Sequence, residues 1–197
     1  MSESFVTPGP EALRALAHPV RLRMLGMLRV DGPDTASGLG RRLDLNSGAT
    51  SYHLRQLARH GFIEEDAERG NGRERWWRAV HASTRTPRAE AGLAPADLDA
   101  REAYLQAVVT THAGLLQRAV TQQRQLPEAW RDAATFSDWV LRLTPARAAE
   151  LRDAMVVLLQ DFAEDGPDAP DALPYTVNVN AYLHPDAGDG LVGGDAR

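Results

Sequence analysis

The chain has 197 residues, of which 43% are hydrophobic and 25% are charged, a composition typical of a soluble globular protein. This composition excludes a chain disordered throughout, a collagen-like repeat and a coiled-coil rod, and no stretch approaches the roughly 18–20 consecutive apolar residues of a membrane helix. The sequence contains no cysteine, which excludes disulfides, thiolate metal sites and cysteine nucleophiles.

Charge is distributed unevenly along the chain. Residues 1–88 carry 14 Arg against 10 Asp and Glu, a net charge of +4, whereas residues 89–197 carry 8 Arg against 17 acidic residues, a net charge of −9. The two halves therefore suggest a polyanion-binding domain followed by an acidic partner-binding or regulatory region. The first four residues lack the basic and apolar stretches of a signal peptide, so we expect a cytoplasmic protein.

Residues 1–10 contain Pro8-Gly9-Pro10 and are expected to form a flexible arm. Four helices are predicted after this arm from apolar residues at helical spacing. Prolines, polar caps and glycines mark where the helices begin and end. The predicted helices span residues 11–17, residues 19–30, a short segment after Asp34 or Thr35, and a segment from Asn46 or Ser47 to His60.

Two strand-like runs follow the fourth helix. They cover residues 62–66 and 73–80 and flank the dipeptide Asn71-Gly72, which is one of the strongest local signals of a β-hairpin. Helices followed by such a hairpin are the plan of a winged helix-turn-helix domain. We assign this DNA-binding domain to residues 11–82, and the fold class to mainly α with a small β component (α+β).

The fourth helix carries the strongest indication of function. At about 100° per residue, Thr50, Leu54 and Leu57 share an inner apolar face, with His53 beside them. The opposite face offers small residues for close approach, hydroxyls for phosphate, and Arg and Gln donors for base edges. The alternative is a surface helix with an ordinary polar face. The candidate DNA-binding residues of this helix are Ser47, Gly48, Ser51, Tyr52, Arg55, Gln56 and Arg59.

The tip of the hairpin is a second candidate for DNA contact. Its polar side chains are suited to phosphate or to the minor groove. The alternative is a solvated tip whose arginines pair with Glu68 and Glu74. For His53 we favour a packed, hydrogen-bonded histidine over one that reads a base. The candidate residues of the hairpin are Arg69, Asn71, Arg73 and Arg75.

The sequence from about residue 10 to residue 82 contains motifs of a known family. Residues 13–25, Leu-Arg-Ala-Leu-Ala-His-Pro-Val-Arg-Leu-Arg-Met-Leu, resemble the opening helices of ArsR-type winged-helix regulators. Residues 49–57, Ala-Thr-Ser-Tyr-His-Leu-Arg-Gln-Leu, resemble their recognition helix, and Gly61-Phe62-Ile63 with the Arg/Trp-rich hairpin resembles their wing. The resemblance implies a homodimeric bacterial transcriptional regulator, usually a repressor. The chain is longer than the metal-sensing members and resembles longer actinobacterial relatives with an added C-terminal region.

The C-terminal half begins with a predicted linker over residues 83–96, rich in Ser, Thr, Pro, Gly and Ala. A long helix is predicted over residues 97–126, with an apolar stripe near heptad spacing that Arg101 and Gln122 interrupt. We therefore expect a packed dimer helix rather than a coiled coil. Its candidate interface residues are Leu98, Leu105, Val108, His112, Leu115 and Ala119.

Residues 97–185 are expected to combine dimerisation with a response to a small-molecule effector. A strand over residues 136–143, a helix over 145–162 and a one-faced strand over 175–183 predict a small α+β layer. This layer could hold an apolar ligand, and the alternative is a filled core that enlarges the dimer interface. Residues 186–197 are rich in Gly and Asp and are predicted to form a disordered tail. The candidate pocket residues are Phe136, Trp139, Met155 and Tyr175.

The sequence lacks the motifs of other chemistries. The six histidines form no i, i+4 pair, so we expect no metal and no cofactor, although a site between subunits around His112 stays open. No phosphate-binding Gly-x-x-x-x-Gly-Lys and no Gly-x-Ser-x-Gly turn is present, so we do not expect an enzyme.

These observations together predict a transcriptional regulator. We expect a repressor that binds an inverted-repeat operator in double-stranded DNA as a homodimer, with no membrane partner. The first rival is a winged-helix interaction module without sequence-specific DNA binding. The second, which we favour less, is an enzyme with a site in the C-terminal region.

Overall fold

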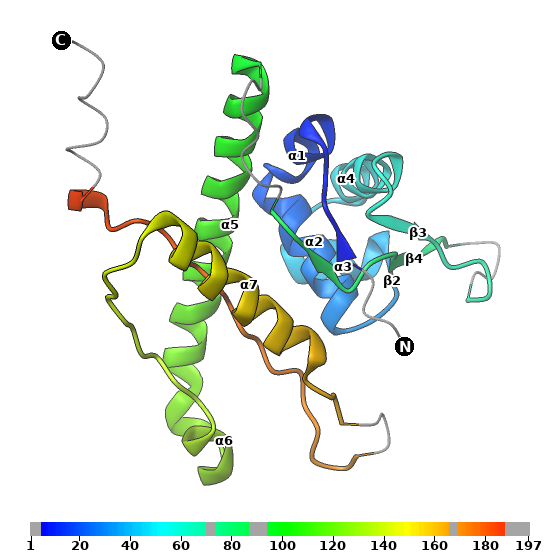
Figure 1. Ribbon diagram of the computed structural model, residues 1–197. Helices are drawn as coiled ribbons and strands as arrows, with labels where there is room; N and C mark the ends of the chain where they lie inside the picture. Colours follow the sequence, from blue (N-terminus) through cyan, green and yellow to red (C-terminus); the bar gives the residue numbers. More distant parts are fainter. Residues whose placement is uncertain (1–4, 70–73, 87–93, 166–168, 188–197) are drawn as a thin grey trace. The chain divides into compact units, whose positions relative to one another are not determined.

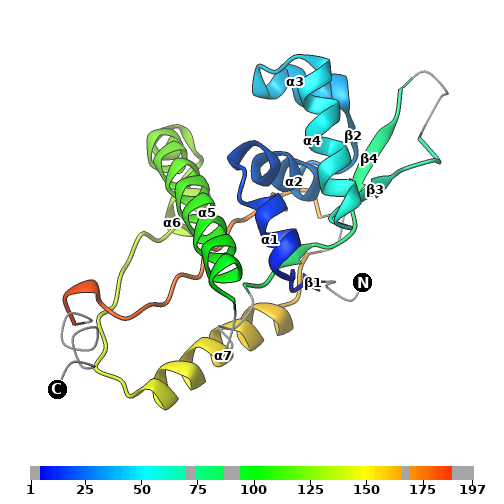
Figure 2. The same ribbon diagram turned by 90° about the horizontal axis from the view of Figure 1, so that it is seen from above.

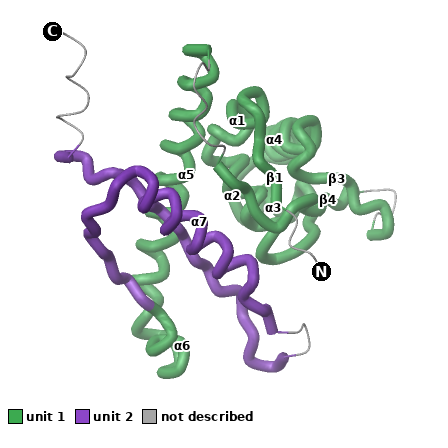
Figure 3. Tube along the Cα trace, viewed as in Figure 1, with its two compact units in different colours: residues 1–134 green, residues 135–197 purple. Residues whose placement is uncertain are grey.

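The structure, a computed structural model, describes residues 5–69, 74–86, 94–165 and 169–187 (Figure 1). The chain divides into two units, residues 1–134 and residues 135–197, and each is described by itself (Figure 3). Unit 1 is mainly helical with a small sheet, and helices dominate the described part of the chain, in agreement with the predicted α+β class.

The first two helices of unit 1 meet at His18. α1 spans Pro10–Leu16 and α2 spans Pro19–Val30, within one residue of the prediction. His18 separates the helices because a proline disfavours helical backbone in the residue before it. The amide of Val20 donates a hydrogen bond to His18 Nδ1 at 3.2 Å, which caps the start of α2.

The next two helices are joined by a tight turn. α3 spans Ala36–Leu43 and α4 spans Ser47–Arg59. The side chains of Thr35 and Asn46 cap these helices by accepting hydrogen bonds from backbone amides of the first turns. Asp44 follows α3 in the left-handed conformation, with φ 55°, and so turns the chain toward α4. Each cap is one of the two residues that the sequence offered.

A three-stranded antiparallel sheet combines a short strand before α3 with the two strands after α4. β2 spans Asp34–Thr35, β3 spans Ile63–Glu65 and β4 spans Trp76–Ala79, in the order β2-β4-β3. Gly61, with φ 72°, follows α4 and lets the chain enter β3. The expected hairpin is therefore present, but its Asn71-Gly72 turn lies outside the described residues.

A second, two-stranded sheet was not predicted. β1, Phe5–Val6, pairs in parallel with β5, Ser83–Thr84, and the guanidinium of Arg85 lies 3.6 Å from the centre of the Phe5 ring. Part of the expected arm and the start of the expected linker are therefore tied to each other. Pairs of two residues are too short to leave a periodic pattern in a sequence.

One apolar core holds unit 1 together. It collects side chains from α1, α2, α3, α4, both hairpin strands and the long helix that follows. Burial of each such side chain contributes about 1.5–3 kcal/mol. The buried members are Leu13, Leu16, Met24, Leu25, Leu28, Leu39, Leu54, Leu57, Phe62, Ile63, Trp77 and Tyr104.

The long helix α5 packs on α1 and α2. It spans Pro95–Gln122, and the 3₁₀ turn Gln123–Gln125 and the short helix α6, Glu128–Asp132, follow it. Its buried residues are Ala100, Tyr104 and Ala107. Among the described residues, no helix combines the length and the apolarity that a membrane span requires.

Unit 2 contains one long helix and two extended stretches. α7 spans Pro145–Asp161, and the side chain of Thr144 caps it. The strands expected over residues 136–143 and 175–183 are not formed, because a strand needs a neighbouring strand and neither stretch belongs to a sheet of the described residues. The helix prediction was correct and both strand predictions were wrong for the single chain. No described residue of unit 2 is buried.

Candidate nucleic-acid interface

α4 presents the face that the sequence assigns to DNA. Thr50, Leu54 and Leu57 are buried, so the opposite face of the helix points away from the core. The seven candidates of this helix lie outside the buried face, as the helical projection predicts. The exposed ones are Ser47, Gly48, Tyr52, Arg55 and Arg59, and the half-buried ones are Ser51 and Gln56.

The contact between α3 and α4 fixes how α4 is presented. A Cβ atom on Gly40 would lie 2.9 Å from the carbonyl oxygen of Leu45 and 3.0 Å from Thr50 Oγ1. Only glycine allows this approach without a shift of the backbone. The hydroxyl of Thr50 also donates to the carbonyl of Asn46 at 3.0 Å, which ties the buried face of α4 to its own start.

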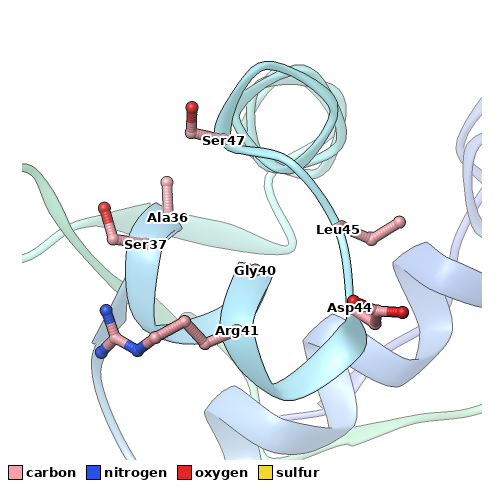
Figure 4. Close-up of a pocket in the computed structure, with 7 residues that line it drawn as sticks. All are labelled: Ala36, Ser37, Gly40, Arg41, Asp44, Leu45 and Ser47. Atoms are coloured by element: carbon pink, nitrogen blue, oxygen red, sulfur yellow. The ribbon is translucent and has the colours of Figure 1, made fainter.

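An open pocket lies where α3 turns into α4 (Figure 4). Ser37 and Arg41 line it from α3, and Ser47 lines it from the start of α4. The first amides of a helix and its dipole favour an anion at this end. The hydroxyls, the guanidinium and the helix N-terminus favour a phosphate group of a DNA backbone, whereas the carboxylate of Asp44, which lines the same pocket, opposes one.

The hairpin lies beside α4. Figures 1 and 2 show α4 and the β3–β4 hairpin next to each other, on the side of unit 1 away from α5. Arg69 and Arg75 are exposed, whereas Asn71 and Arg73 lie outside the described residues. Buried Trp77 belongs to the core and half-buried Trp76 lies near the guanidinium of Arg69. Two of the four predicted wing residues are therefore exposed on the hairpin that lies beside α4.

Every described arginine of the hairpin has a carboxylate near it. Arg69 lies 3.6 Å from Asp66, Arg75 lies 3.8 Å from Glu65, and Arg78 lies 2.7 Å from Glu64 (each distance from a guanidinium nitrogen to a carboxylate oxygen). The pairs of Arg75 and Arg78 are exposed and each contributes at most about 1 kcal/mol, whereas the side chain of Asp66 is only 13% exposed. The expected partners Glu68 and Glu74 are not the ones that these distances identify.

His53 packs against His18 at the junction of α4 and α2. The two ring centres are 4.6 Å apart, and Nδ1 of His53 has no hydrogen-bond partner among the described residues. Burial lowers the pKa of both rings, and the charge of nearby Arg21 lowers both further. The packed position agrees with the prediction, while the expected hydrogen bond is not made at Nδ1.

Arg29 is a contact residue that the sequence did not indicate. Its Nε donates to the carbonyl of His81 at 2.8 Å, and its terminal nitrogen donates to Thr84 Oγ1 at 2.9 Å. Burial lowers the pKa of this guanidinium to about 10. The hydroxyl of buried Tyr104 on α5 interacts with the same charge. One side chain thereby links α2, the segment after the wing and α5, and an arginine near a helix end gives no sequence signal of that role.

The predicted interface stripe of α5 divides into two groups. Leu105 and Val108 pack against the core, and His112 is half-buried. The remaining members Leu98, Leu115 and Ala119 are exposed. The stripe thus mixes residues that hold α5 to its own domain with residues that are open to a partner, because the helix carries apolar side chains on more than one face.

The predicted pocket residues of unit 2 do not enclose a cavity in the single chain. Phe136, Trp139 and Tyr175 are more than half exposed, and Met155 is half-buried. A ligand site needs lining residues that are mostly covered, so effector binding at this place stays a prediction. In the described part of the chain, no three His, Asp or Glu side chains gather closely enough to hold a metal ion.

Residues 16–66, which run from the end of α1 past the start of the hairpin, match a protein family described as a helix-turn-helix domain. These residues form a helix-turn-helix domain. The domain and the exposed donors of α4 support a DNA-binding transcriptional regulator.

Comparison with whole proteins adds little to this match. No curated protein sequence matches the chain. Among solved structures, reduced HlyU from Vibrio cholerae N16961 is 30% identical over 35% of this chain and 68% of that chain, with a TM-score of 0.31. The ArsR-type assignment therefore stays a prediction, and the fold rests on the elements themselves and on the helix-turn-helix match.

Proposed function

We propose that the protein is a cytoplasmic transcriptional repressor that binds an inverted-repeat operator as a homodimer. The observation that carries the proposal is the outward face of α4 within a matched helix-turn-helix domain. Tyr52, Arg55 and Arg59 are exposed on this face, and small residues at its start leave room for close approach. A helix with this distribution fits the major groove.

In this arrangement the two ends of α4 have different tasks. Ser47 and Gly48 bring the helix N-terminus close to the backbone, and Ser37 and Arg41 of the adjacent pocket meet the same phosphates. Arg55, one turn or more further along, reaches base edges, where a guanidinium can donate to guanine O6 and N7 together. The phosphate contacts thus set the position of the protein on the DNA, and the base contacts determine which DNA sequence it binds.

The hairpin acts as the wing beside this helix. Arg69 and Arg75 are exposed residues of the hairpin, which lies beside α4, so both can approach the backbone that flanks the major groove. The carboxylate of Glu65 is exposed, so a DNA phosphate competes with it for Arg75 at low cost, whereas Arg69 is exposed beside the more covered carboxylate of Asp66. The wing therefore adds affinity without reading sequence.

An uncovered stripe on α5 supports the homodimer. Leu98, Val109, Leu116 and Val120 are 43–58% exposed. On a regular helix they fall within a sector of about 40°, well away from buried Ala100, Tyr104 and Ala107. A two-fold contact through this stripe buries it against its own copy and places two recognition helices for successive major grooves.

The effector response is assigned to residues 97–185, which lie in the acidic C-terminal half of the chain. Residues 89–197 carry a net charge of −9, which makes them unsuited to a second DNA-binding surface. A ligand acts there only if it binds the DNA-bound and DNA-free forms with different affinity.

Selection of bound sequences from a random double-stranded library tests the proposal. The full chain should enrich an imperfect inverted repeat, with half-sites about one helical turn apart. Enrichment of a single half-site would support sequence-specific DNA binding but contradict binding as a homodimer. A library that emerges unchanged from several rounds would overturn sequence-specific binding.

One observation favours the rival interaction module. Arg69, Arg75 and Arg78 each have a carboxylate within 4.0 Å, so the described part of the wing carries less free positive charge than its arginines alone suggest. An unchanged library together with a stable dimer would favour this module over a repressor.

A further inference from the structure

Two stretches of unit 2 are extended but have no neighbouring strand. Residues 136–143 and residues 176–183 carry the residue patterns of strands, yet neither belongs to a sheet. No backbone hydrogen bond joins either stretch to another described residue. The backbone groups of a β-strand bond to a neighbouring strand, so both stretches lack the partner that a strand requires.

Many apolar side chains of unit 2 are also largely exposed. Trp139 is 77% exposed, Val140 is 79% exposed and Tyr182 is 78% exposed. α7 has no buried residue either, although it carries Val157, Leu158 and Leu159 in succession. Ordering a chain costs about 1–2 kcal/mol per residue in backbone entropy, which apolar burial must offset. No described residue of unit 2 is buried, so the apolar burial that would offset this entropy has to come from a surface outside unit 2.

The sequence of the second stretch suits pairing with a copy of itself. Successive side chains of a strand point to opposite faces, so its apolar residues share one face. In an antiparallel pair centred on Val179, Val177 of one copy lies opposite Ala181 of the other, and Asn178 lies opposite Asn180. The apolar residues of both copies then form a single face. These residues are Val177, Val179, Ala181 and Leu183.

The absence of charge points to a second copy as the occupant. Residues 174–183 contain no charged side chain, although 25% of the chain is charged. Exposed strand edges are usually protected from pairing by charges or by proline within the strand. A strand that pairs with its own copy must also lack charge near the symmetry axis, because identical charges would meet there. Pairing with a foreign peptide imposes no such requirement.

We propose that residues 176–183 form a β-strand by pairing antiparallel with the same residues of a second copy. The two strands present one continuous apolar face, against which the apolar side chains of residues 136–143 and of α7 can be buried. This proposal rests on the homodimer proposed above and deepens it, because it gives unit 2 a dimer contact of its own in addition to the stripe on α5.

A mixed-label NMR experiment on the full chain tests the proposal. Dimers are assembled from one ¹³C-methyl-labelled copy and one unlabelled copy, and only contacts between copies are recorded. Methyl groups of Val177, Val179 and Ala181 should show contacts to residues 176–183 of the unlabelled copy, and the amides of this stretch should exchange slowly with solvent. Slow exchange without contacts between copies would mean pairing within one chain, and fast exchange would mean no pairing. Either result overturns the proposal.

The same experiment separates this proposal from the homodimer. Methyl groups of Leu116 and Val120 on α5 report a dimer held by that helix. If they show contacts between copies while Val179 shows none, the homodimer stands and the pairing of unit 2 is wrong. If neither shows contacts and the protein sediments as a monomer, the homodimer itself has failed.

A pair of variants gives an independent reading. Val179→Asp places two carboxylates opposite each other on the apolar face and should weaken dimerisation at least about tenfold. Asn180→Asp adds the same charge to the other face and should have a much smaller effect. Circular dichroism shows whether the helices of both variants are retained. Equal dimer dissociation constants for the two variants would overturn the proposed pairing.

Discussion

At the scale of single residues, Arg55 is the side chain to which the proposed function assigns base reading. Its side chain is exposed on the outer face of α4, while the side chain of Leu54 is buried in the core and anchors the helix there. Arg55→Ala should weaken binding to the selected operator by about 1–3 kcal/mol and reduce discrimination against unrelated DNA, because a bidentate base contact is lost. Fluorescence anisotropy with both DNAs measures this. Arg147→Ala on α7 is the matched control. If the Arg55→Ala variant is a folded dimer and keeps the parental affinity and specificity for the operator, Arg55 does not contact a base.

The pair of His18 and His53 gives the domain a defined response to acid. Burial lowers both pKa values below the ordinary 6.5, and the charge of Arg21 acts in the same direction. Each ring therefore binds a proton more weakly in the folded chain than in the unfolded chain. The free energy of unfolding is therefore highest above about pH 6.5, where both rings are neutral in the unfolded chain as well. It decreases as the pH falls from 6.5 toward the lowered pKa values of the folded chain.

This response can be measured by urea unfolding between pH 7.5 and pH 5. The free energy of unfolding of the parent chain should fall with decreasing pH, and His53→Gln should flatten the fall because one titrating ring is removed. His184→Gln, in the other unit, is the control and should keep the parental slope. A parental slope in the His53 variant as well would show that this ring does not couple to folding.

At the scale of elements, Arg29 connects the helix-turn-helix to its surroundings. Its two hydrogen bonds reach the carbonyl of His81 and the hydroxyl of Thr84. Arg29→Met should destabilise the chain by about 2–3 kcal/mol, because these half-buried groups lose a charged partner. Arg29→Lys should recover little, since an ammonium cannot reproduce the fork of donors. Arg23→Met, at an exposed position of α2, should change stability by less than about 0.5 kcal/mol. Thermal or urea unfolding that ranks Arg29 and Arg23 equally would contradict the linking role.

The wing is tested through its salt dependence. Arg75 is exposed and lies 3.8 Å from Glu65, an ion pair of little net energy. If Arg75 meets phosphate, Arg75→Ala should weaken all DNA sequences about equally and lower the slope of log K against log salt by about one. Titrations at several salt concentrations give this slope. A parental slope would place Arg75 in solvent, paired with Glu65 alone.

The same elements show how far a sequence can predict this fold. Helix boundaries were predicted closely because the caps are local, as Thr35 and Asn46 illustrate. The outward face of α4 followed from helical geometry alone. The two-residue strands β1, β2 and β5 were missed, because their pairing depends on partners far along the chain. The strands expected in unit 2 were wrong for a single chain for the same reason, since alternation predicts a face but not the neighbour that pairs with it.

At the scale of the whole molecule, α5 carries two apolar faces. Ala100, Tyr104 and Ala107 hold the helix to α1 and α2, while Leu98 and Leu116 stay exposed on another side. The predicted stripe combined members of both faces, because the sequence does not rank two apolar faces of one helix. The structure separates them, and the exposed face is therefore the one to alter when the domain must stay folded.

Leu116→Asp tests whether this exposed face joins two copies. Leu116 is 43% exposed in the single chain, so an aspartate is tolerated by the folded domain but not by an apolar contact between copies. We expect the variant to sediment as a monomer and to bind an isolated half-site with about the parental affinity. Its affinity for the full inverted repeat should fall by 100-fold or more, roughly 3 kcal/mol, because the second half-site no longer adds to binding.

Gln117→Asp places the same charge on the neighbouring exposed position and should remain a dimer. If Leu116→Asp also stays a dimer and keeps its affinity for the full operator, α5 does not supply the contact, and the two recognition helices must be held together through unit 2 alone.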